Sequence, residues 1–146
     1  MGTLTDVIND PQRRRAIVQD ANHVLEQEVS DKSGLTGLAV KGAFALVKAV
    51  KPGIIPEVIE SLLPEFTGAI DPILAKRPAG TSPQAYIQER ANDIVQALLG
   101  VTDARAQKTS HQSLTSAYKK LRPTGEKHVL AAIPRVAALV GRFVPA

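Results

Sequence analysis

The chain of 146 residues has no cysteine and no tryptophan, and only five of its residues are aromatic. Without cysteine it can form neither a disulfide bond nor a thiolate zinc site, and cysteine-dependent catalysis is excluded. Yet 44% of the residues are hydrophobic, so the apolar mass consists mainly of Ala, Val, Leu and Ile. A chain of this length and composition buries roughly 68–70% of its unfolded surface when it folds. We therefore expect one domain that spans residues 1–146.

Long uninterrupted apolar runs are also missing. The most apolar window covers residues 34–50 and contains Lys41 and Lys48, each of which costs about 2.5–3.5 kcal/mol near the centre of a bilayer. No transmembrane span is therefore predicted. The N-terminal segment has no apolar core ahead of its arginines, so it does not resemble a secretory signal. The expected location is the cytoplasm.

Apolar residues recur with helical rather than strand periodicity along the chain. The predicted fold is all-α: a single-domain irregular bundle of five to seven helices with proline-broken segments. Asp10 followed by Pro11 is typical of an N-cap and a first helical position, so a helix is predicted to begin there. Further helices are predicted over residues 34–51, 81–99 and 126–143, and a weaker helical stretch over 102–121 with a break at 109–110. Thr81 is expected to cap the helix over 81–99 and Gly100 to end it. The helix over 126–143 is predicted to have one apolar face, formed by Val129, Ile133, Val136, Val140 and Phe143.

Proline divides the segment between residues 54 and 78, where it recurs at Pro56, Pro64 and Pro72. A proline inside a helix costs about 3 kcal/mol. Two interpretations fit: short helices that each begin with a proline, or one helix that is kinked at Pro64 and Pro72. We favour the short helices, because Glu57 and Glu65 follow prolines directly and would place a carboxylate near the positive end of a helix.

The helix predicted over residues 34–51 is apolar around most of its circumference. Its three lysines, at 41, 48 and 51, fall within an arc of about 80° together with Phe44. A helix that is apolar over so wide an arc is expected to be packed on several sides. The sequence therefore predicts that this helix forms the centre of the bundle and that only its lysine edge reaches water.

Residues that could carry out catalysis or bind a metal do not occur in a recognisable pattern. His23, His111 and His128 lack the spacing of a paired Glu-x-x-His metal site. Neither a Gly-x-Ser-x-Gly elbow nor a phosphate-binding glycine loop is present. The sequence favours a non-catalytic protein over an enzyme, and it predicts neither a cofactor nor a bound metal.

The surplus of small apolar residues suggests a binding function. If so few large rings leave a gap in the interior, the gap would hold an apolar, lipid-like small molecule. Its acidic head group would then bind at the lysine edge formed by Lys41, Phe44, Lys48 and Lys51. Alternatively, an apolar helix face that one chain cannot cover would be buried in a homodimer. The simplest interpretation is that the lysines are only the solvated edge of a central helix.

An alternative function follows from the uneven distribution of charge. Residues 74–146 contain eleven basic and four acidic side chains, whereas residues 1–73 contain seven and ten. Nucleic acid or an anionic membrane surface would bind at two basic clusters: Arg13, Arg14 and Arg15, and Lys119, Lys120 and Arg122. We rank this alternative lower, because acidic residues flank the arginines, no nucleic-acid recognition motif occurs, and many core helices of basic proteins are equally amphipathic.

Overall fold

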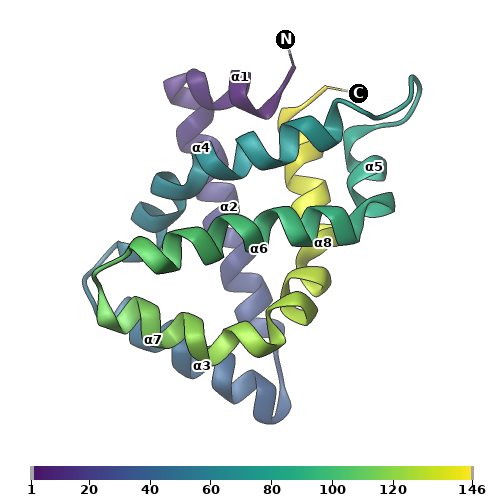
Figure 1. Ribbon diagram of the computed structural model, residues 1–146. Coiled ribbons are helices and arrows are strands. Elements are labelled where there is room, and N and C mark those ends of the chain that lie inside the picture. Colours follow the sequence, from purple (N-terminus) through teal and green to yellow (C-terminus); the bar gives the residue numbers. More distant parts are fainter. Residues whose placement is uncertain (1, 146) are drawn as a thin grey trace.

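The computed structural model describes residues 2–145, and within this range the chain is helical without any β-strand (Figure 1). The elements in chain order are α1 (Leu4–Asn9), α2 (Pro11–Asp31), α3 (Gly34–Lys48), α4 (Ile54–Leu74), α5 (Pro83–Glu89), α6 (Ala91–Lys108), α7 (Gln112–Leu121), the 3-10 helix η1 (Arg122–Thr124) and α8 (Gly125–Phe143). The predicted all-α bundle is confirmed. Within residues 2–145, no helix is both long and apolar enough to cross a lipid bilayer.

Helix α2 begins where the sequence predicts. The side chain of Asp10 accepts a hydrogen bond from the backbone N–H of Gln12 at 3.1 Å, and Pro11 takes the first helical position. The preceding helix α1 was not predicted. It is capped by Thr3 and also by Asp71 of α4, whose carboxylate accepts from the N–H of Leu4 at 2.9 Å. This second cap comes from 67 residues away, so no local pattern could indicate it.

The segment around Pro64 and Pro72 is one continuous helix, α4, so the favoured prediction of short helices is wrong. Pro64 has no N–H to donate to the carbonyl of Glu60, four residues earlier. The guanidinium of Arg14 on α2 donates to that carbonyl instead, at 3.3 Å. Both prolines lie on the exposed side of α4. Helix α4 therefore continues through Pro64 while the carbonyl of Glu60 is bound by a donor from another helix.

The helix predicted over residues 81–99 is in fact two helices. The N-cap is Ser82 rather than Thr81, and α5 ends before Arg90, whose backbone angles are not helical. Gly100 was predicted to end a helix, but α6 continues to Lys108. Gly100 does not have the positive φ with which a glycine terminates a helix. The predicted break at 109–110 and the predicted helix over 126–143 are both found, the latter as α8.

The main hydrophobic core lies between α1, α2, α4, α5, α6 and α8. Ile87, Ile94 and Val140 are among its most buried side chains. The apolar face predicted for α8 contributes throughout its length, with Ile133 and Val140 buried and Val129, Val136 and Phe143 packed against the core. In Figure 1, α3 and α7 lie at the end of the molecule opposite the two chain termini. No buried residue of α3 or α7 belongs to the main core.

The prediction that residues 34–51 form the centre of the bundle is therefore wrong. The helix ends at Lys48, packs mainly against α7, and makes smaller contacts with α2 and α4. Leu35 and Leu38 are 87% and 69% exposed, and Ala45 is also exposed. The physical reason is that α3 has two apolar faces, of which its own chain covers only one.

Candidate functional site

The outer face of α3 is an apolar surface that the described chain leaves uncovered. At 100° per residue its members fall within an arc of about 120° on one side of the helix. We define the outer face by these exposed residues: Leu35, Leu38, Ala39, Gly42, Ala45 and Leu46. Leu35, Leu38 and Leu46 are among the most exposed large hydrophobic side chains of the molecule. A row of exposed leucines on one helix is the type of patch that marks an interaction site.

The opposite face of α3 fixes the helix to the rest of the protein through small residues. Gly37, Val40 and Ala43 are buried there. A Cβ atom on Gly37 would lie 2.7 Å from the backbone carbon of Lys32, so only glycine fits where the chain enters the helix. The close inner packing holds α3 in an orientation that directs its leucines outward.

The predicted lysine edge lies beside the outer face. Lys41 and Lys48 are exposed, and the ammonium group of Lys48 lies 4.7 Å from the centre of the Phe44 ring. Lys51 follows the helix and pairs with Glu57 at 3.0 Å. The structure thus brings Lys41, Phe44 and Lys48 together, as a border of the outer face rather than at the mouth of an interior cavity.

Acidic residues are absent from the chain segments that build this end of the molecule, residues 32–56 and 104–125. Four of the nine basic side chains in these segments form ion pairs: Lys32, Lys51, Arg105 and Arg122. The other five are exposed and form no ion pair within residues 2–145: Lys41, Lys48, Lys108, Lys119 and Lys120. We call these the five free lysines. Of these, Lys41 and Lys48 lie on α3 beside the outer face, which therefore has a positively charged border.

A surface hollow of about 460 Å³ lies at the start of α3. Its lining combines the basic side chains of Lys32 and Lys41 with the apolar side chains of Leu35 and Leu38. The hollow is therefore part of the same surface as the outer face. A ligand cavity inside the bundle was predicted on the premise that α3 is central, and that premise does not hold.

The arginine cluster at the start of α2 is used mainly for internal contacts. Arg13 donates to the carbonyl oxygen of Phe143 at 2.8 Å and so binds the C-terminal end of α8. Arg14 donates to the carbonyl oxygen of Glu60, while Arg15 is exposed. Within residues 2–145, Arg15 is therefore the only member of this predicted anion-binding cluster that forms neither a hydrogen bond nor an ion pair through its side chain. The second cluster is likewise divided: Lys119 and Lys120 are exposed, whereas Arg122 pairs with Asp103.

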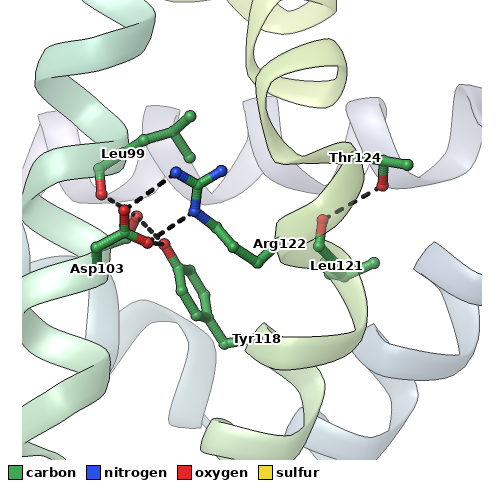
Figure 2. Close-up of polar contacts among 7 residues, drawn as sticks. Leu99, Asp103, Tyr118, Leu121, Arg122 and Thr124 are labelled. Carbon is green, nitrogen blue, oxygen red and sulfur yellow. Dashed lines mark hydrogen bonds and ion pairs between the residues drawn. The ribbon is translucent and has the colours of Figure 1, made fainter.

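A polar cluster around Asp103 joins α7 and η1 to α6 (Figure 2). Arg122 donates to both carboxylate oxygens of Asp103, at 2.8 and 3.1 Å, and the hydroxyl of Tyr118 donates to the same carboxylate. Thr102 Oγ1 lies 2.8 Å from the Tyr118 hydroxyl oxygen. The hydrogen bonds from Arg122 and then from Tyr118 lower the pKa of Asp103 below its ordinary value. Burial, followed by the bond to Asp103, raises the pKa of Tyr118.

The Asp103 cluster has the geometry of a structural clamp. The carboxylate is already occupied by three donors, and the hydroxyl of Tyr118 is bound on both sides. Neither Asp103 nor Tyr118 was predicted from the sequence to be a functional residue, and Arg122 was predicted to bind an anionic partner. The only local signal is that Tyr118 and Arg122 are four residues apart, which places them on one helical face.

Metal-binding geometry is not found in the part of the chain that the structure describes. Across residues 2–145, no three side chains of His, Cys, Asp or Glu approach closely enough to hold a metal ion. His23 and His111 are exposed, and the imidazole of His128 lies 2.9 Å from the hydroxyl of Thr124. Burial and the nearby charges of Lys32 and Lys127 lower the pKa of His128.

Comparison with known proteins places the chain in a family. The family of unknown function DUF6918 matches residues 4–144. The chain belongs to this family. Because the match extends from α1 to α8, the outer face of α3 lies within the DUF6918 region. No curated protein and no solved structure matches the chain.

Proposed function

We propose that this DUF6918 protein is a non-catalytic docking module. Its working surface is the outer face of α3, and its partner is another molecule with an apolar surface bordered by negative charge. The observation that carries the proposal is the exposure of Leu35 and Leu38, at 87% and 69%, beside Lys41 and Lys48, which form no ion pair within residues 2–145. Exposed leucines favour an apolar contact, and the lysines at its border favour an anionic one.

A second copy of the chain fits this surface poorly. In a two-fold contact the same patch meets itself, so the lysines of one outer face would lie against those of the other. Neither chain has an acidic residue in residues 32–56 to compensate. Nucleic acid also fits poorly, because phosphate groups give the leucines of the outer face no apolar surface to contact. Both considerations favour a partner that combines an apolar surface with negative charge.

The test uses the natural absence of cysteine. Gly42→Cys provides a unique site for an environment-sensitive dye in the middle of the outer face, where a Cβ meets no atom within 4 Å. Gly68→Cys, exposed on α4 and equally open, is the matched control. In an extract of cells that produce the protein, the dye at position 42 is expected to shift to shorter wavelength, and the dye at position 68 is not.

Polar replacement of the outer face should remove this shift. The double variant Leu35→Gln, Leu38→Gln should fold normally, because both side chains are largely exposed, and should leave the dye in water. Leu130→Gln, at an exposed leucine on α8, is the control for this change. The absence of any shift in the extract contradicts the proposal. So does a shift in the purified protein alone that grows with its concentration, since it indicates a second copy.

A further inference from the structure

We infer that the partner of the outer face is an anionic lipid bilayer, which Lys41, Lys48 and the leucines of α3 contact together. This inference rests on the proposed docking function and specifies its partner. A helix that lies in a membrane interface has one apolar face, which enters the boundary between head groups and acyl chains, and a border of Lys or Arg side chains. The outer face of α3 and its border have this composition.

The shape of the surface favours a lipid over a protein. The outer face is the convex side of one helix of 15 residues, about 22 Å long at 1.5 Å per residue. It projects from one end of the molecule, where α3 is covered by α7 on its inner side (Figure 1). An acidic protein partner would need a matching groove, whereas the lipid surface accommodates a convex helix of any outline. The leucines enter the interface, and the long lysine side chains extend toward the head groups.

The arrangement of charge leads to the same choice. The five free lysines are spread over α3, the end of α6 and α7, and no acidic residue occurs among them in residues 32–56 or 104–125. A surface of mobile anionic lipids attracts every lysine that comes within about 10 Å, without requiring fixed pairs. Each lysine near such a surface contributes roughly a fivefold increase in affinity.

The experiment measures binding of the full chain to two kinds of vesicle, one an equimolar mixture of phosphatidylglycerol and phosphatidylcholine and the other pure phosphatidylcholine. Cosedimentation and the dye at Gly42→Cys report binding, with Gly68→Cys as the control position. We expect binding to the anionic vesicles, a shift to shorter wavelength only at position 42, and weaker binding as the salt concentration rises. Pure phosphatidylcholine should bind at least tenfold more weakly.

Two double variants separate the apolar contribution from the charge. Lys41→Gln with Lys48→Gln should weaken binding to anionic vesicles about 25-fold, and Leu35→Gln with Leu38→Gln at least tenfold. The controls are Lys76→Gln, an exposed lysine that follows α4, and Leu130→Gln. Both are expected to bind within about twofold of the unmodified chain, since neither residue belongs to the outer face or to the five free lysines.

The two proposals fail in different ways. If neither vesicle binds, or both bind equally, the inferred bilayer is wrong. If the dye at position 42 nevertheless shifts in the cell extract, and protease treatment of the extract abolishes the shift, the partner is an acidic protein and the docking function stands. If the dye shifts neither with vesicles nor in the extract, both proposals are wrong. If Leu35→Gln with Leu38→Gln leaves binding to anionic vesicles unchanged, the outer face does not contribute to that binding and its proposed role is wrong.

Discussion

At the scale of single residues, the charges that hold helices together are paired, whereas the lysines beside the proposed docking surface are not. Asp103 is half-exposed, yet its carboxylate binds Arg122 through two hydrogen bonds and Tyr118 through a third. Residues 104–125, which follow Asp103, contain no acidic side chain. Within this segment Asp103 pairs with Arg122 and with no other basic residue. The two lysines of α7 therefore form no ion pair within residues 2–145, and their positive charge is not cancelled by Asp103.

The role of Asp103 predicts a specific dependence of stability on pH. Its pKa is lowered in the folded protein, chiefly by the hydrogen bond from Arg122. A carboxylate with a depressed folded pKa adds stability above its ordinary pKa of about 3.9, and this contribution is lost as the pH falls through the folded value. In urea unfolding, Asp103→Asn should therefore be less stable than the unmodified chain near pH 7, and the difference should shrink as the pH falls through the lowered folded pKa of Asp103.

The control for this measurement is Asp93→Asn on the same helix, whose carboxylate lies 3.9 Å from Arg90 at an exposed position. Surface pairs of this kind contribute little to stability, so this variant should follow the unmodified chain across the pH range. A deficit of Asp103→Asn that stays constant from pH 7 down to the lowest pH at which the protein still folds would show that the amide disturbs packing rather than removing a charged contact.

At the scale of helices, the sequence predicts the features that local patterns determine and misses those that depend on contacts with distant parts of the chain. Asp10 with Pro11 and the apolar face of α8 are local patterns, and the structure confirms both. The continuity of α4 at Pro64 depends on Arg14, 46 residues away from the carbonyl it binds. The exposure of α3 was missed for a similar reason. A helix that is apolar all round has the same sequence whether its second face meets its own chain or a separate partner.

The account of α4 predicts coupling between Pro64 and Arg14. Pro64→Ala restores an N–H for the carbonyl of Glu60 and removes a proline from a helix interior, so it should raise the free energy of unfolding by about 2 kcal/mol. Arg14→Ala should destabilise the unmodified chain more than it destabilises the Pro64→Ala variant, because the restored N–H occupies the same carbonyl. A double-mutant cycle measured by urea unfolding gives this difference, expected at about 0.5–1 kcal/mol.

An independent background provides the control for the cycle. Pro134→Ala removes another exposed proline from a helix interior, in α8, but leaves the carbonyl of Glu60 unchanged. Arg14→Ala should therefore cost the same in that background as in the unmodified chain. Equal costs of Arg14→Ala in all three backgrounds would mean that the hydrogen bond to Glu60 does not support α4 at Pro64.

At the scale of the whole molecule, stability and proposed function reside in different parts. The main core joins α1, α2, α4, α5, α6 and α8, whereas α3 and α7 pack on each other at one end (Figure 1). Their contact includes small buried residues such as Val40, Ala43 and Ala117. The packing beneath the exposed leucines is therefore separate from the main core and is built from small side chains. Parts of a protein with few buried apolar contacts open with lower free energies than its core.

This division predicts the pattern of amide hydrogen exchange. Amides in the middle of α3, around Val40 and Ala43, should open with a free energy at least about 2 kcal/mol below that of amides around Ile133 and Val140 in α8.

Tyr118→Phe removes a hydrogen bond from the clamp that holds α7 to α6, so it should lower protection in α7 and α3 and leave α8 unchanged. Ile94→Ala, a cavity in the main core, should instead lower protection in every helix that exchanges through global unfolding. The prediction is wrong if α3 and α8 open with equal free energies and respond equally to Tyr118→Phe. The protein would then open as one cooperative unit, and the proposed docking end would have no independent stability.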